Sequence, residues 1–216
     1  RAAARQYGVA VPSMAMSGFF AQSFLTRDNY QDLLKDCFQT MKLFGSKVAF
    51  LPLGGSGKDW QQEGCTAYQQ MVSRLRTAGE MAKQEGITIG IRTGMDAKFD
   101  KKLLKKVGSS QIKVYYNFQD AADHHRDICK ELRKLGAQRI VQIHASNTDS
   151  VNLQEDSEIN LPKIRKTLDK MKWSGWLVVE RSRDVKRVRD VKYNFGRNIA
   201  YLKQVFQEVT VSGNNW

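Results

Sequence analysis

Short apolar runs alternate with amphipathic stretches along the whole chain, and this alternation limits the fold more than any other feature. The runs predict strands at 8–14, 47–51, 87–92, 112–117, 139–144 and 176–180. The stretches between them place apolar residues at helical spacing, as at 29–44, 66–84, 120–135, 161–171 and 194–205. Nearly all-apolar strands, each followed by a helix, predict a parallel sheet that is covered by helices.

A closed (β/α)8 barrel and an open doubly wound sheet both satisfy this pattern. An open sheet usually carries a glycine-rich turn after its first strand. The glycine-rich turn of this chain, Gly54 to Lys58, follows the second predicted strand instead. It also lacks the residues of a phosphate-binding loop, because Pro52 replaces the first glycine and Asp59 replaces Ser or Thr. The predicted fold is therefore the closed barrel.

The strand count leaves this barrel incomplete. A (β/α)8 barrel has eight strand–helix units, whereas six strands are predicted here. We therefore expect residues 1–216 to form one barrel domain that lacks two units on its N-terminal side. The first strand should then have an unpaired edge, unless upstream residues or another molecule cover it.

The charge and the cysteines narrow the choice of partners. The net charge is +13, but the basic residues are dispersed over predicted helix faces among Asp and Glu. No nucleic-acid-binding motif is present, and no apolar run is long enough for a membrane span, so we expect neither nucleic acid nor a membrane as partner. A basic surface does attract anionic substrates such as sugar phosphates. The three cysteines are far apart in the sequence, which argues against a disulfide framework or a zinc site.

Four of the predicted strands end on a polar or ionisable residue: Arg92, Asn117, His144 and Glu180. In a parallel barrel these ends point into one mouth, so the four strands should be neighbours with converging side chains. A half-buried guanidinium needs a carboxylate, and we expect Arg92 to form a bidentate pair with Glu180 across the mouth. The alternative is that Arg92 turns outward and binds an anionic group of a substrate.

Further candidates lie next to these strand ends. Asp120 either binds substrate or caps the next helix. Lys58 and Asp59 either reach a substrate phosphate or belong to a plain loop. Two of the strand-end residues also have a structural alternative. His144 is either a site residue or a buried histidine bonded to its neighbours. Glu180 is either a site residue or part of a structural ion pair with Arg181 or Arg183. Phe19, Phe20 and Phe24 either line the mouth or pack in the core, and His124 and His125 are expected on the surface of a helix.

Several segments together resemble a known family: Ile112 to Asn117, Arg139 to His144, Leu161 to Ile164, Trp173 to Arg183 and Asn198 to Lys203. They resemble the sugar phosphate isomerase/epimerase family, which has xylose isomerase-like TIM barrels, and particularly the branch typical of Bacteroidetes. The resemblance extends from Gly8 to Phe206. It aligns the six predicted strands with the third to eighth strands of the family barrel.

The resemblance implies a metal site that has lost part of its ligands. In the family, Glu, Asp, His and Glu at the last four strand ends hold one divalent metal, and the two glutamates exchange a proton next to a carbonyl. The corresponding residues here are Arg92, Asn117, His144 and Glu180. Asn117, His144 and Glu180 still offer ligands for Mn²⁺, Mg²⁺ or Co²⁺. Arg92 neither ligates a metal nor acts as a base at neutral pH, so a metal is doubtful and a relay of two glutamates is lost.

The implied function is isomerase or epimerase chemistry on a small sugar, keto-sugar or sugar phosphate. His144 and Glu180 would be catalytic, and Arg92, Asp120, Lys58 and Arg183 would bind the substrate. Two alternatives remain: a sugar-binding descendant without catalysis, and a keto-sugar lyase or hydratase with Glu180 or His144 as its base. The AP-endonuclease relatives use several metals and more histidines than the three present here. A homo-oligomer is compatible with the sequence, and so are both a cytoplasmic and a periplasmic location.

Overall fold

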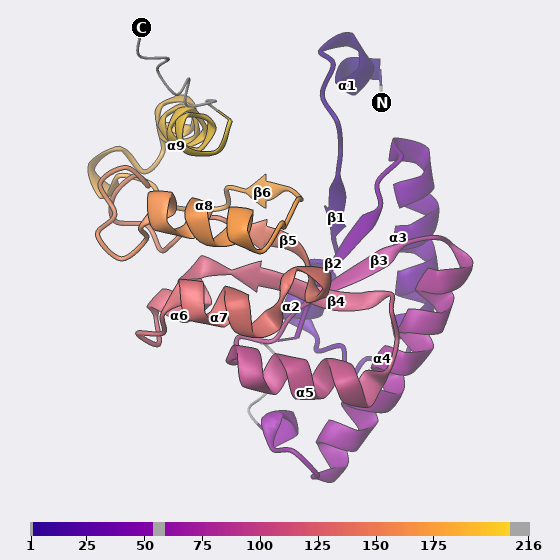
Figure 1. The fold of residues 1–216 in the computed structure, drawn as a ribbon. Helices are drawn as coiled ribbons and strands as arrows, with labels where there is room; N and C mark the ends of the chain where they lie inside the picture. Colours follow the sequence, from indigo (N-terminus) through magenta and orange to yellow (C-terminus); the bar gives the residue numbers. More distant parts are fainter. Residues whose placement is uncertain (1, 54–58, 208–216) are drawn as a thin grey trace, which may run out of the picture.

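The computed structural model describes residues 2–53 and 59–207. In these ranges, six strands form one parallel sheet in the order of the sequence. The sheet curls into an open half-barrel (Figure 1). Its strands are β1 (Ser13–Ala15), β2 (Val48–Pro52), β3 (Thr88–Arg92), β4 (Ile112–Asn117), β5 (Ile140–His144) and β6 (Leu177–Val178).

The longer helices lie on the outer side of this sheet or beyond its two edges (Figure 1). The α-helices are α1 (Ala2–Gln6), α2 (Gly18–Ala21), α3 (Tyr30–Phe44), α4 (Thr66–Gln84), α5 (Ala97–Val107), α6 (Phe118–Ala122), α7 (Ile128–Leu135), α8 (Leu161–Lys170) and α9 (Val191–Phe206). The short 3₁₀ helices among the described residues are η1 (Asp59–Gln61), η2 (Ala137–Arg139) and η3 (Val185–Arg187). None of the described helices has the length and hydropathy of a membrane span.

Alternation along the strands separates the packed outer layer from the barrel interior. Ile89 and Ile91 of β3 point outward into a core cluster with α3 and α4. Gly90, between them, faces inward, where a Cβ atom would lie 2.9 Å from Val141 and 3.0 Å from Tyr115. The interior at this level is therefore filled by side chains, and only glycine fits at position 90.

Three predicted elements differ from the observed ones. The predicted helix 120–135 is two helices, α6 and α7, because Asp127 caps a new helix by accepting a hydrogen bond from the Lys130 N–H. His124 and His125 lie in the turn between them, exposed, and His125 has φ +51°. The strand predicted at 8–14 is observed at Ser13–Ala15, and the one predicted at 176–180 is observed at Leu177–Val178; each lies at a sheet edge with a partner on one side.

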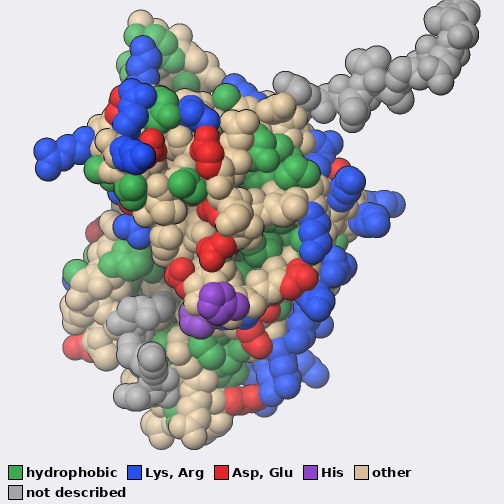
Figure 2. Space-filling view, turned by 90° about the vertical axis from the view of Figure 1, so that its left-hand side faces the viewer, with side chains coloured by type: hydrophobic (Ala, Val, Ile, Leu, Met, Phe, Trp, Pro, Cys, Tyr) green, Lys and Arg blue, Asp and Glu red, His purple; other side chains and the backbone are tan. Residues whose placement is uncertain are grey.

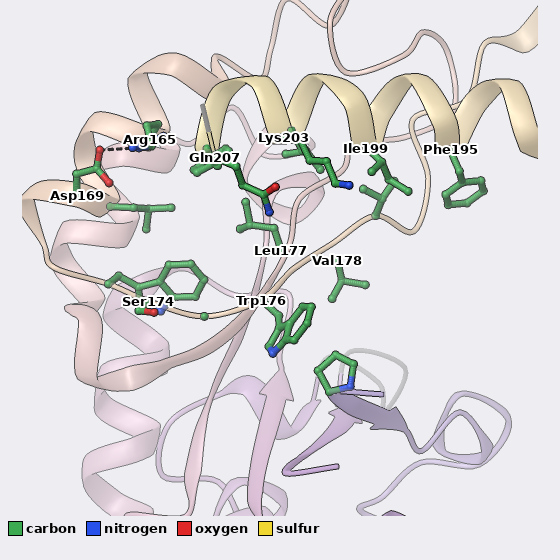
Figure 3. A pocket seen from close by; sticks show the side chains of 17 residues that line it. Arg165, Asp169, Ser174, Trp176, Leu177, Val178, Phe195, Ile199, Lys203 and Gln207 are labelled. Atoms are coloured by element: carbon green, nitrogen blue, oxygen red, sulfur yellow. Dashed lines mark hydrogen bonds and ion pairs between the residues drawn. The ribbon is translucent and has the colours of Figure 1, made fainter. Parts of the chain in front are cut away.

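The predicted unpaired edge of the first strand is confirmed in the described ranges, where β1 and β6 are the two edge strands. Ser13 of β1 reaches across the interior to Gln142 of β5, with 3.1 Å between its Oγ and Nε2. Two hollows lie along the edges, one of about 630 Å³ between β6 and α9 and one of about 860 Å³ beside β1. In the first, Phe195 and Ile199 of α9 face the β6 segment (Figure 3), and Trp176 is 52% exposed.

Candidate active site at the carboxyl ends of the strands

The polar strand ends meet at one mouth, as predicted. Asn117 lies opposite His144 in the sheet register, and His144 lies opposite Val178. The Nδ2 atom of Asn117 is 3.4 Å from Nδ1 of His144, which in turn is 3.5 Å from Oε2 of Glu180. Glu180 itself comes two residues after the end of β6, and its side chain is 45% exposed. Figure 2 shows one face of the molecule, with acidic side chains near histidine side chains in its middle; the exposed histidines are His124 and His125, whereas His144 is buried.

A register shift in β5 brings Asn117 and His144 together. Val114 pairs with Ile140, whereas Tyr115 pairs with Gln142, so Val141 has no partner on β4. Without this bulge, Asn117 would lie opposite Ile143, whose side chain belongs to the outer core. Bulges commonly re-aim side chains next to functional sites. The shift therefore turns His144 toward the mouth beside Asn117.

His144 is a buried, neutral imidazole. Burial, together with the nearby positive charge of Arg92, lowers the pKa of His144 to about 4, while Asp120 opposes the shift. The ring packs against Tyr115 and Phe50, with ring centroids 4.5 Å and 5.2 Å away. His144 is therefore available as a proton acceptor or hydrogen-bond partner at neutral pH.

The aromatic rings around His144 form the floor of the mouth. Phe50 and Tyr115 pack with centroids 4.7 Å apart. Burial raises the pKa of Tyr115, so its phenol stays protonated. Phe20 of α2 lies 6.4 Å from Phe50 and is 54% exposed, whereas Phe19 and Phe24 are buried in the core. Of the three phenylalanines considered, Phe20 is the one that offers an open apolar face here.

The predicted pair of Arg92 with Glu180 is wrong. Arg92 forms a bidentate pair with Asp120, whose side chain, like that of Arg92, is about one-fifth exposed. Burial lowers the pKa of Arg92, but the hydrogen bonds that Arg92 donates to Asp120, together with the negative charges of Asp120, Glu180 and Asp123, raise this pKa above its usual value. The reason is proximity: Asp120 is in the first turn after β4, next to β3, whereas Glu180 follows β6. Arg92 is thus neither paired across the mouth nor turned outward.

Asn117, not Asp120, caps α6. The Oδ1 atom of Asn117 accepts a hydrogen bond from the Gln119 N–H at 2.8 Å. This leaves a guanidinium, an engaged amide oxygen, His144 and Glu180 at the four strand ends. In the described ranges, no three His, Cys, Asp or Glu side chains are grouped as a metal site would need. This donor set does not fit a divalent centre with four ligands of the family type.

The loops after β5 and β6 are joined by polar contacts. Ser146 Oγ accepts hydrogen bonds from the N–H groups of Glu180 and Arg181. Arg183 forms a bidentate pair with Asp149, and Arg181 also approaches Asp149, with 3.7 Å between its Nε and Oδ2. Both arginines thus approach Asp149 rather than Glu180, which leaves the Glu180 side chain beside His144.

A buried asparagine network supports the β6 loop, and the sequence interpretation missed it. Ser182 is fully buried with φ +68°, a conformation that residues other than glycine rarely adopt. Asn198 of α9 donates to the Ser182 carbonyl and accepts from the Leu153 N–H, both at 2.8 Å. Asn152 donates to the same carbonyl and to Asn194. Asparagines inside a helix are poor helix formers, and this was the signal that could have identified Asn194 and Asn198.

Two further candidates come from the glycine-rich turn and its end. Lys58 lies outside the described residues. Asp59 is the first residue of η1. Arg183 is tied to Asp149 as described, so among the expected substrate-binding residues Arg92, Asp120 and Arg183 all have charged partners within the chain.

Comparison with solved structures shows the same fold in several sugar enzymes. A 3-keto-D-glucoside 4-epimerase from E. coli matches with a TM-score of 0.75 and 12% identity, over 94% of this chain and 82% of that chain. A D-psicose 3-epimerase matches with 0.74 and 13%, over 96% and 82%. A sugar phosphate isomerase/epimerase from Parabacteroides distasonis matches with 0.70 and 15%, over 92% and 72%. At these identities the likeness shows the fold alone.

Sequence comparison identifies the family directly. No match was found among functionally curated proteins. The sequence model of the xylose isomerase-like TIM barrels matches residues 1–205, nearly the whole chain. This match agrees with the parallel half-barrel and with the polar strand ends at its mouth. The chain therefore belongs to the xylose isomerase-like TIM barrel family.

Proposed function

We propose that the protein binds a small keto-sugar or sugar phosphate at the mouth and moves a proton next to its carbonyl without a divalent metal. The observation that carries this proposal is the contact of Glu180 with the neutral His144. An exposed carboxylate beside a neutral imidazole is a suitable general base. Three solved structures of similar fold are described as sugar epimerases or isomerases, which supports the substrate class.

In the proposed step, Glu180 removes the proton from the carbon next to the carbonyl. The electron pair of the broken C–H bond forms the C–C double bond of an enediolate, and negative charge develops on the carbonyl oxygen. Arg92, which Asp120 holds in place, provides positive charge near this oxygen. The proton of the adjacent hydroxyl passes to the enediolate oxygen, and return of the proton from Glu180 to the former carbonyl carbon completes the reaction, with the new carbonyl at the adjacent carbon. A single base favours isomerisation over epimerisation, which needs proton transfer on both faces of the carbon.

Phe20 and Phe50 would contribute apolar contacts to the sugar ring. Phe20 has an open face beside Phe50, and Phe50 packs against His144. Sugars expose C–H groups on one face of the ring, and a partly exposed aromatic ring is a matching surface. We therefore expect the carbonyl end of the substrate at His144 and Glu180, and its remaining carbons toward Phe20.

Proton exchange with solvent tests this function. The protein is incubated in D₂O and EDTA with D-fructose, D-psicose or D-tagatose, and the loss of α-proton signals is followed by ¹H NMR. We expect exchange of at least one sugar, its loss in Glu180→Gln, and its retention in Glu80→Gln, a matched change on the exposed side of α4. Exchange that starts only when Mn²⁺ is added would contradict the metal-free step.

A sugar-binding protein without catalysis is the second candidate. The observation in its favour is that Arg92 and Asp120 neutralise each other, so two expected substrate-binding groups satisfy one another. In that case the same sugars would shift protein NMR signals near His144 and Tyr115 but would show no deuterium exchange. The two candidates are thus distinguished by one set of samples.

A further inference from the structure

A second hollow with a marked charge lies at the opposite end of the strands. It has a volume of about 500 Å³ and lies between α5 and the segments that lead into β4 and β5. Lys113 on its wall is four residues before Asn117 in β4, so the hollow is about 13 Å away from the mouth. Its lining residues are Lys101, Leu104, Lys105, Ser109, Ser110, Ile112, Lys113, Gln138 and Arg139, which we call the basic groove.

The basic groove contains four cations and no carboxylate. Lys101 and Lys105 come from one face of α5, Lys113 from β4 and Arg139 from the end of η2. In the described ranges none of these four forms an ion pair, whereas some other surface cations do. Lys102 pairs with Glu63, and Arg165 with Asp169, each at 2.7 Å. Lys166 and Lys170 on α8 form no ion pair among the described residues either, so what distinguishes the groove is that four cations and no carboxylate line one hollow. Basic side chains are also seen along one side of Figure 2.

Stabilisation of the C-terminus of α5 does not account for the position of Lys101 and Lys105 in the groove. Cations near a helix C-terminus stabilise its free carbonyl groups. At the end of α5 this role is filled by Arg76 of α4, which donates to the carbonyls of Lys106 and Val107. Arg139 uses one nitrogen, Nη1, for the Leu135 carbonyl at the end of α7. The ammonium groups of Lys101 and Lys105 have no such carbonyl partner among the described residues.

The polar loop in the basic groove is held in place. Gly108 ends α5 in the left-handed conformation, with φ +71°. Ser109 Oγ accepts a hydrogen bond from the Gln111 N–H, and the Ser109 side chain packs on Gly79 of α4, where a Cβ atom would lie 2.4 Å away. Ser109, Ser110 and Gln138 therefore present hydroxyl and amide groups beside the four cations from a fixed backbone.

We propose that the basic groove binds a small phosphorylated molecule through its phosphoryl group. Several cations with hydroxyl and amide donors match the charge and the acceptor oxygens of a phosphoryl group. A volume near 500 Å³ is in the range of small-molecule sites, and a concave site suits a compact ligand better than an extended polyanion. The site is independent of the proposed function at the mouth, because none of its residues reaches His144 or Glu180.

Pyrophosphate is the probe for this proposal, measured by isothermal titration calorimetry at low ionic strength. We expect saturable binding with one site, and at least about tenfold weaker binding in Lys101→Met/Lys105→Met, which removes two groove cations. The matched control is Lys166→Met/Lys170→Met, because these lysines are exposed, have the same spacing and lie on α8. Ser110→Asp places a carboxylate in the groove and should weaken binding as well. Thermal unfolding checks that each variant is folded.

Several outcomes would overturn the proposal. Equal weakening in the two double variants would show general attraction to a positive surface. Loss of binding in Arg181→Met, with no loss in the groove variant, would place the anion at the mouth. Binding of duplex DNA or of phosphatidylserine vesicles without binding of pyrophosphate would show that the surface recognises a polyanion instead.

Discussion

Arg92 donates two hydrogen bonds to the carboxylate of Asp120, with Nε 2.9 Å from Oδ2 and Nη2 2.7 Å from Oδ1. The pair joins β3 to the helix after β4 and fixes a cation at a strand end of the mouth. It also explains how a guanidinium is tolerated among partly buried groups, because its charge is compensated locally. The position of Arg92 is therefore a consequence of where α6 begins.

The pair should contribute to stability. Asp120→Asn removes the charge that compensates Arg92, and we expect it to lower the free energy of unfolding by about 2 kcal/mol. Urea denaturation measures this, with Asp36→Asn as the control, since Asp36 is exposed on α3. The double variant Arg92→Met/Asp120→Asn should lose less than the sum of its single changes. Strict additivity would show that the two side chains do not interact.

Metal binding should depend on residue 92. We expect the wild-type protein, dialysed against Mn²⁺ and analysed by mass spectrometry, to retain no stoichiometric metal. Arg92→Glu removes the guanidinium and adds a carboxylate near His144 and Glu180, so this variant should retain Mn²⁺. Arg92→Met is the control, because it removes the charge without adding a ligand. Stoichiometric Mn²⁺ in the wild type would contradict the degenerate site.

The sequence predicted the scaffold well where local signals and tertiary packing agree. Helix α4 and strand β4 have the predicted bounds, since each is a long periodic or apolar run with a clear end. The order of the strands and the meeting of Asn117, His144 and Glu180 also followed from the alternation of strand and helix.

The failures concern features that depend on local geometry. The predicted partner of Arg92 was wrong. The helix after β4 begins at Phe118, and this brings Asp120 within reach of Arg92 on β3. The bulge at Val141 could not be predicted from the sequence. The residues of β5 are mostly apolar and suit a strand in either register, so the sequence does not show where the register shifts. The network around Ser182 joins residues from 147 to 198, and such distant hydrogen bonds are not visible in a sequence pattern.

Asp100 should make stability depend on pH. Burial raises the pKa of Asp100 to about 7, although its 2.6 Å hydrogen bond with Thr93 partly opposes the shift. In the unfolded chain this pKa is about 4, so the folded state binds the extra proton between these values. The contribution of Asp100 to stability is therefore present at low pH and is lost as the pH rises from about 4 to 7.

Asp100→Asn is the variant that isolates this effect, because the amide cannot ionise and still bonds to Thr93. His144 acts in the opposite direction, since its lowered pKa makes stability rise between about pH 4 and 6.5. With Asp100 removed, the stability measured by urea denaturation should increase more steeply with pH in this window than in the wild type. Parallel profiles for the two proteins would show that Asp100 titrates normally.

Asn198 should control the order of the loop that carries Glu180 and Arg181. Its side chain is 1% exposed and bonds to both the Ser182 carbonyl and the Leu153 N–H. In Asn198→Ala both backbone groups lose a buried partner, so we expect a loss of about 2–3 kcal/mol in the free energy of unfolding. Asn198→Asp keeps an acceptor for Leu153 but cannot donate to Ser182, and it should disturb mainly the 181–183 segment.

Hydrogen–deuterium exchange separates these two variants. Asn198→Ala should speed amide exchange at both Leu153 and residues 181–183, whereas Asn198→Asp should speed it mainly at 181–183, where Ser182 is held at positive φ by the bonds to its carbonyl. Arg197→Ala, one residue earlier on α9, is the control, because Arg197 pairs with Glu155 at the surface. Unchanged exchange at 181–183 in both Asn198 variants would mean that the loop is ordered by Ser146 and Asp149 alone, through their contacts with residues 180–183.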